Sequence, residues 1–143
     1  MMRLSEAWNL YEQDKRLLGY SPHTLKSYRL QCILLIRHFG DVDVQDIAFE
    51  ALKAYLAKDA ERLKPASIGH RVRFLKSLFR WATDEGYCAP NPAAKLQEPK
   101  LGRRIPKFIP SDVLEELRLA CRTPLEYALV EFLYSTGCRI GEV

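Results

Sequence analysis

Apolar residues recur at spacings of three and four along almost the whole of this 143-residue chain, and this periodicity constrains its fold most strongly. Such spacing places apolar side chains on one face of an α-helix, whereas a half-buried β-strand needs strict alternation of apolar and polar residues. No convincing alternating segment is present. The sequence therefore predicts an all-α chain, and its first helices are expected over about residues 5–18, 21–39, 46–58 and 65–85.

Turn residues support these boundaries. Ser21 and Pro22 form an N-cap followed by proline at the first helical position, which is typical of a helix start. Gly19, Gly40 and Gly86 each follow a predicted helix, where glycine commonly ends the helical conformation.

The segment after Pro65 carries three kinds of side chain on three sides of one helix. Its predicted core face, at 100° per residue, collects Ile68, Val72, Leu75, Phe79 and Ala82. Arg73, Lys76 and Arg80 form a basic stripe on a second side. Phe74 and Trp81 point in a third direction, where we expect them to pack against another helix. Because no acidic residue occurs between Arg62 and Thr83, we expect the basic stripe to contact a polyanion.

Charge is distributed unevenly along the chain. Residues 62–107 hold eleven basic and three acidic residues, a net charge of +8, whereas the remainder carries −4. A basic middle between mildly acidic ends favours a polyanionic partner such as nucleic acid. A solvated basic surface gives the same count, so charge alone does not decide between them.

Several classes of protein are disfavoured by what the sequence lacks. No apolar run approaches the roughly 18 residues of a membrane span, and no apolar signal-peptide stretch precedes the first charges. Cys32, Cys88, Cys121 and Cys138 are far apart and form no CxxC pair, which argues against a zinc site or a disulfide framework. We therefore expect a cytoplasmic protein with no membrane contact, metal or cofactor.

The amino-acid composition changes after residue 88. Four prolines and five basic residues between residues 88 and 110 exclude a long helix and predict an extended basic linker. Two further helices are expected over about residues 111–121 and 123–137; Ser111 is the predicted cap of the first, and Thr123 and Glu126 form a capping box for the second. A last helix begins near Arg139 and has only one turn, so we expect the chain to be truncated within a second domain.

The residues around Arg139 resemble a known motif. In Leu133–Val143, the positions Thr136, Gly137, Arg139 and Glu142 resemble the first catalytic-arginine motif of tyrosine recombinases of the phage-integrase and Xer type. Upstream, Ser21–Thr24 with Tyr28 and the segment 67–81 resemble helices of that family's DNA-binding domain. Asn91-Pro92-Ala93, then Pro99-Lys100 and Ile105-Pro106, resemble its interdomain linker, so the likeness covers essentially the whole chain.

This resemblance implies an organisation and a function. It implies a SAM-like four-helix core-binding domain over residues 1–88, a basic interdomain linker over 89–110 and the start of a catalytic domain over 111–143. It also implies binding of double-stranded DNA in site-specific recombination or integration, with self-association on DNA as a tetramer. The family's catalysis needs a tyrosine nucleophile, a second arginine and other residues, and only the first arginine maps here, at Arg139. We therefore expect the chain alone to be inactive, with Glu142 bracing Arg139 or nearby backbone amides.

The candidate DNA contacts combine the basic stripe with neighbouring cations. They are His23, Lys26, Arg71, Arg73, Lys76, Arg80, Arg103, Arg104 and Lys107. Two alternatives remain open at this point. A non-enzymatic helical DNA-binding regulator would use a similar basic face, whereas a helical protein-interaction module would present the aromatic face of Phe74 and Trp81 to a partner helix.

Overall fold

The computed structural model describes residues 1–103, 105 and 107–142. These described residues form helices and contain no β-strand, which confirms the all-α prediction. The elements are α1 (Leu4–Leu17), α2 (Pro22–Phe39), η1 (Val44–Asp46), α3 (Phe49–Lys58), α4 (Pro65–Asp84), α5 (Ser111–Ala120), α6 (Pro124–Thr136) and η2 (Ile140–Glu142). The chain divides into two compact units, residues 1–102 and residues 103–143. Within the described ranges, no helix is both long and apolar enough to cross a membrane.

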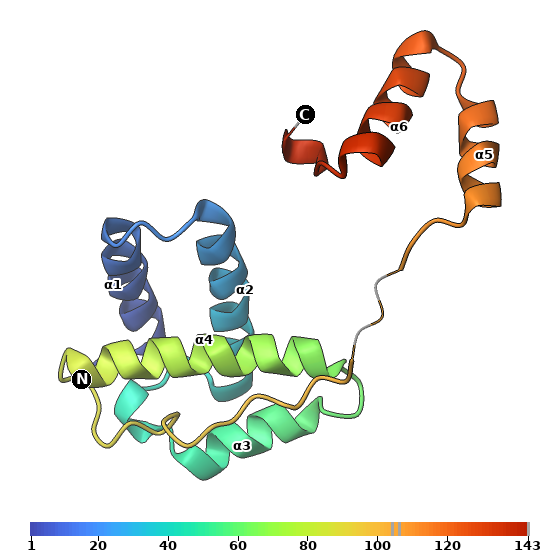
Figure 1. The fold of residues 1–143 in the computed structure, drawn as a ribbon. Helices are drawn as coiled ribbons and strands as arrows, with labels where there is room; N and C mark the ends of the chain where they lie inside the picture. Colours follow the sequence, from blue (N-terminus) through green and yellow to red (C-terminus); the bar gives the residue numbers. More distant parts are fainter. Residues whose placement is uncertain (104, 106, 143) are drawn as a thin grey trace. The chain divides into compact units, whose positions relative to one another are not determined.

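Helix α4 runs through the middle of the first unit (Figure 1). Helices α1 and α2 lie on one side of it, and α3 lies on the other side together with the chain that follows α4. The largest fully buried side chains come from all four helices and include Tyr11, Leu35, Leu52, Phe74 and Phe79. Because α4 is covered on two sides, it needs more than one apolar face, which explains its mixture of aliphatic and aromatic stripes.

The aromatic stripe of α4 packs against α1 and α2. The ring of Phe74 lies 6.3 Å from Trp8 and 5.4 Å from Tyr28, and Trp81 lies edge-on to Tyr11 at 5.8 Å. The indole N–H of Trp81 donates a hydrogen bond to Asp14 at 2.7 Å. Packing of these aromatics against another helix is thus confirmed. Their burial also removes the surface that a protein-interaction module would have presented.

The predicted helix ends are only partly correct. The hydroxyl of Ser21 accepts a hydrogen bond from the Thr24 amide at 3.1 Å, as expected for the cap of α2. However, α3 begins at Phe49 rather than near Asp46, because the backbone at Ile47 is extended and its side chain is buried. Ser111 is likewise the first residue of α5 and not its cap.

The chain after α4 stays on the first unit as far as Gly102. Cys88, Ala93 and Leu96 are buried in the core, and the side chain of Gln45 forms two hydrogen bonds of 3.0 Å with the Ala89 backbone. Residues 92–95 form turns rather than a helix. The domain boundary at residue 88 therefore stays a prediction, while residues 89–102 belong to the first compact unit and run beside α3 and α4 (Figure 1).

The second unit consists of two capped helices with little core. In α6, Thr123 and Glu126 form the predicted capping box, and Gly137 ends the helix with a φ of 67°. Arg118 of α5 pairs with Glu115 and with Glu131 of α6. Leu114 is the one buried apolar side chain among the described residues of this unit. The helix expected to begin near Arg139 is a short 3-10 turn, η2.

Candidate nucleic-acid interface

Arg73, Lys76 and Arg80 form the basic stripe of α4, and all three side chains are exposed. On the opposite side of the same helix Val72, Leu75 and Phe79 are almost completely buried. The stripe is therefore carried by a helix whose orientation is fixed by its core contacts. This arrangement presents three cations on one face.

Arg73 is partly held by its neighbours. Its Nε lies 3.4 Å from the carboxylate of Glu98, in the segment that follows α4, and 3.4 Å from the Gly69 carbonyl oxygen. Both partners of the ion pair are about half exposed, with side-chain exposures of 54% and 47%. An exposed pair of this kind contributes little stability, so a phosphate can compete with Glu98 for Arg73.

Arg71 does not belong to this exposed surface, in contrast to the prediction. It is 7% exposed, and its Nη1 donates a hydrogen bond to Asp59 at 2.9 Å. The guanidinium also lies over the ring of Tyr55, 5.5 Å from the ring centre. The hydrogen bond from Arg71 holds the pKa of the Asp59 carboxyl below its usual value. Arg71 thus joins the loop after α3 to α4, and we assign it a structural role.

The N-terminal part of α2 packs beside α4. Ser27 and His70 share a hydrogen bond of 2.7 Å, and the rings of Tyr28 and His70 are 5.8 Å apart. Burial, and then the nearby charge of Arg73, lower the pKa of His70 below its usual value, which favours the neutral form of the ring. His23 and Lys26, the predicted contacts on α2, are both exposed.

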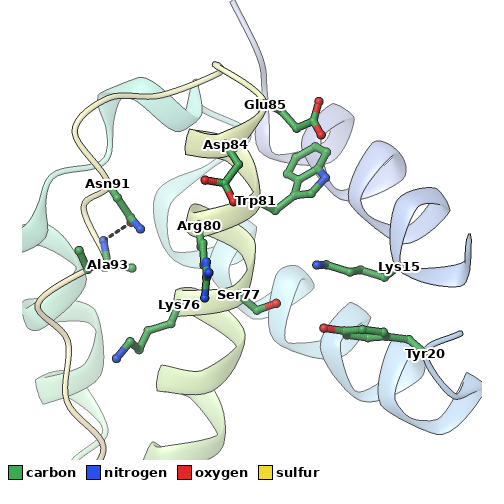
Figure 2. Close-up of a pocket in the computed structure, with 11 residues that line it drawn as sticks. Lys15, Tyr20, Lys76, Ser77, Arg80, Trp81, Asp84, Glu85, Asn91 and Ala93 are labelled. Atoms are coloured by element: carbon green, nitrogen blue, oxygen red, sulfur yellow. Dashed lines mark hydrogen bonds between the residues drawn. The ribbon is translucent and has the colours of Figure 1, made fainter. Parts of the chain in front are cut away.

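A cleft of about 730 Å³ lies beside the basic stripe, between α1, α4 and the turn after α4 (Figure 2). Lys76 and Arg80, two of the predicted DNA contacts, line it from α4. Lys15 of α1 and Tyr20 also line it, and neither was predicted from the sequence. Lys15 follows Tyr11 by four residues and so shares its helix face, but only the tertiary structure places that face beside Arg80.

The predicted contacts beyond residue 102 lie in the second unit. Arg103 and Lys107 are exposed, and Arg104 lies outside the described residues.

The turn after α6 carries the arginine motif. Gly137 adopts a left-handed conformation, φ 67°, that other residues rarely adopt. The carboxylate of Glu142 accepts a hydrogen bond from the Arg139 backbone amide at 3.0 Å, which is one of the two roles expected for it. The side chain of Arg139 is exposed. The turn therefore fixes the backbone of Arg139 while leaving its guanidinium free to meet a phosphate.

A family model of the phage integrase N-terminal SAM-like domain matches residues 14–86, slightly more than half of the chain. The chain belongs to the tyrosine recombinase family. Tyrosine recombinase XerC from Xylella fastidiosa is 30% identical, over 100% of this chain and 51% of that protein. XerC from Chromobacterium violaceum is also 30% identical, over 97% of this chain and 48% of that protein. The chain thus spans about half the length of these tyrosine recombinases.

Solved structures of lambda integrase have the same fold. A lambda integrase dimer bound to a COC′ core site matches 98% of this chain and 40% of its own length, with a TM-score of 0.82 and 23% identity. A lambda integrase tetramer bound to a Holliday junction matches 99% of this chain and 42% of its own length, with a TM-score of 0.83 and 23% identity. This likeness, with the family match, confirms the predicted SAM-like helical fold.

Proposed function

We propose that this tyrosine recombinase chain binds double-stranded DNA during site-specific recombination or integration, and that it does so through the basic stripe of α4. One observation carries the proposal: Arg73, Lys76 and Arg80 are exposed together on a helix whose other sides are buried. Cations held in this way can meet successive phosphates with little loss of conformational freedom on binding.

Further cations complete the proposed set of DNA contacts. We place His23 and Lys26 of α2 and the cations Arg103, Arg104 and Lys107 beside the DNA backbone. Phosphate contacts of this kind position a protein on the duplex but do not read its sequence. Arg71 is left out of the set, because its guanidinium is buried against Asp59 and Tyr55.

The proposal keeps the predicted organisation of the chain. Residues 1–88 form the core-binding domain, residues 89–110 form the interdomain linker and residues 111–143 begin a catalytic domain. The structures of lambda integrase as a dimer and a tetramer on DNA support a proposal that this chain also self-associates on DNA. A DNA-acting role also fits the predicted cytoplasmic location. A non-enzymatic DNA-binding regulator would use the same stripe, but it would take no part in DNA strand cleavage.

The basic stripe can be tested by measuring duplex binding across a salt series. Affinity should fall steeply with salt, and the variant Arg73→Ala/Lys76→Ala/Arg80→Ala should lower the slope of log K against log salt by about 2.7, because about 0.9 is lost per phosphate contact. The control Lys53→Ala/Lys58→Ala/Lys64→Ala removes three exposed charges elsewhere in the first unit. Equal slopes for the two variants, or no binding by the unmodified chain at low salt, would refute the proposal.

We further propose that Arg139 has the catalytic role of the first arginine in tyrosine recombinases and that residues 1–143 alone neither cleave nor join DNA. An arginine can grip two phosphate oxygens but cannot attack the phosphorus. The other members of such a constellation act as a unit with it, so little activity is expected from one member. Incubation with a nicked suicide duplex should give no covalent protein–DNA adduct on a denaturing gel. An adduct that disappears when one of the seven tyrosines becomes phenylalanine would contradict this expectation.

A further inference from the structure

The cleft of Figure 2 adds a cation from α1 to the basic stripe of α4. Its α4 side carries Lys76 and Arg80, and Lys15 reaches it from α1. In Figure 2 the side chains of Lys15 and Tyr20 both point toward Ser77. Cations and hydroxyls from separate elements thus gather in one place.

Lys15 is positioned by aromatic rings and not by an acid. Its ammonium lies 5.5 Å from the ring centre of Tyr11 and 5.3 Å from that of Tyr20. No carboxylate among the described residues lies within ion-pair distance of it, whereas the next residue, Arg16, pairs with Glu12 at 2.8 Å. Cation–π contacts hold the ammonium in place without neutralising its charge. Lys15 therefore remains available to an anionic ligand.

The hydroxyl groups of the cleft can donate to such a ligand. Ser77 Oγ and the Tyr11 hydroxyl are 2.7 Å apart. Burial raises the pKa of Tyr11, so this hydroxyl stays protonated and can donate to Ser77. The proton of Ser77 is then free to point into the cleft beside the hydroxyl of Tyr20.

The acidic residues of the cleft lie at its other end. Asp84 and Glu85 stand one turn beyond Arg80 on α4, and the carboxylate of nearby Asp14 already accepts the Trp81 indole N–H. An anion is therefore favoured beside Lys15 and Arg80 and disfavoured toward Asp84. The cleft, about 730 Å³ and open to solvent, is large enough for a segment of nucleic-acid backbone rather than for one small ion.

We infer that this cleft binds a phosphodiester of the DNA backbone, with Lys15 and Tyr20 extending the DNA-binding surface from α4 onto α1. Arg80 grips the phosphate oxygens with its planar fork, Lys15 supplies a point charge, and the hydroxyls of Tyr20 and Ser77 donate hydrogen bonds. This inference rests on the proposed DNA-binding function and assigns that function a residue outside the predicted set.

The test is duplex binding by Lys15→Gln, measured by fluorescence anisotropy across a salt series. The variant should lower the salt slope by about 0.9, so that its affinity falls about 3.5-fold less than that of the unmodified chain between about 50 and 200 mM salt. Lys15→Arg should restore the slope. The matched control Lys58→Gln removes one exposed charge from α3 and should leave the slope unchanged.

The outcomes separate this inference from the proposed function. If the unmodified chain binds with a steep salt slope but Lys15→Gln and Lys58→Gln behave alike, the cleft inference is wrong and the proposed function stands. If the unmodified chain does not bind, both are wrong. Thermal melts of Lys15→Gln and Lys15→Arg check that the fold is retained. Because Trp81 lines the cleft, its fluorescence also reports on a free anion. A saturable change with inorganic phosphate at constant ionic strength would overturn the backbone assignment in favour of an isolated phosphate site.

Discussion

Residues 1–102 and residues 103–142 are both built from helices with apolar residues at spacings of three and four, yet the first region buries many of these residues and the described part of the second buries one. In the first region apolar side chains of α1 to α4 fill a common core. In the second, apolar residues of α5 and α6 such as Leu119, Leu125 and Phe132 are exposed, and only Leu114 is buried among the described residues. The same sequence pattern thus accompanies two very different degrees of burial.

Differences in helix capping do not account for this difference in burial. Helix α6 has a capping box, a proline at its start and a left-handed glycine at its end, yet it has no buried residue. Helix α4 lacks a side-chain cap and contains nine buried residues. Good local signals at the two ends of a helix thus do not guarantee burial, and stability comes mainly from the packing of its apolar face.

The largest expected difference between the regions is in hydrogen exchange of the full chain. Amides in the middle of α4 should exchange only on global unfolding, whereas those of α6 should exchange through local opening. A global stability of at least about 5 kcal/mol would make α4 exchange more than about 10³-fold slower. Exchange resolved by peptide mass spectrometry measures this directly. Similar protection of α4 and α6 would mean that the second region is stabilised as strongly as the first.

A matched pair of leucines tests the same comparison by mutation. Leu75 is 1% exposed and Leu129 is 45% exposed. Leu75→Ala should lower the free energy of unfolding of the first region by about 2–5 kcal/mol. Leu129→Ala makes the same chemical change and should alter it by no more than about 0.5 kcal/mol. Urea denaturation of both variants decides the matter, and equal effects would show that burial does not distinguish the regions.

The smallest expected effect is the loss of stability on protonation of a histidine. It is confined to the first region, because residues 103–143 contain no histidine. The pKa of His70 is lowered in the folded state, so the unfolded chain binds this proton more readily. The contribution of His70 to the free energy of unfolding should therefore be fully present above the unfolded-state pKa of about 6.5. It should decline as the pH falls below that value. Thermal melts from pH 8 to pH 5 should show a decline that His70→Gln reduces. His23→Gln, at an exposed position, should leave it unchanged, and an identical decline in all three proteins would contradict the assignment.

Much of the fold followed from the sequence, because helix periodicity and capping residues are local properties. The stripe of Arg73, Lys76 and Arg80 also followed, since three positions on one helix have a fixed relation to one another. The positions along the helix did not distinguish the buried Arg71 from these exposed cations. Its burial depends on Asp59 and Tyr55, which reach it only after α3 packs on α4.

Two further features depended on tertiary contacts in the same way. The late start of α3 arises from the burial of Ile47, and Lys15 joins the cleft because α1 packs beside α4. Position along a helix predicts which residues share a face, but it does not show what that face will meet.

The aromatic packing between α1 and α4 has a spectroscopic consequence. The chain has two tryptophans, Trp8 and Trp81, and both lie in this packing. Tryptophan emission therefore reports on residues 1–102 alone, whereas far-ultraviolet circular dichroism sums over the helices of both regions. Where α5 and α6 lose structure separately, the two signals trace different unfolding curves. A single melting temperature taken from fluorescence then describes one region and leaves the other unobserved.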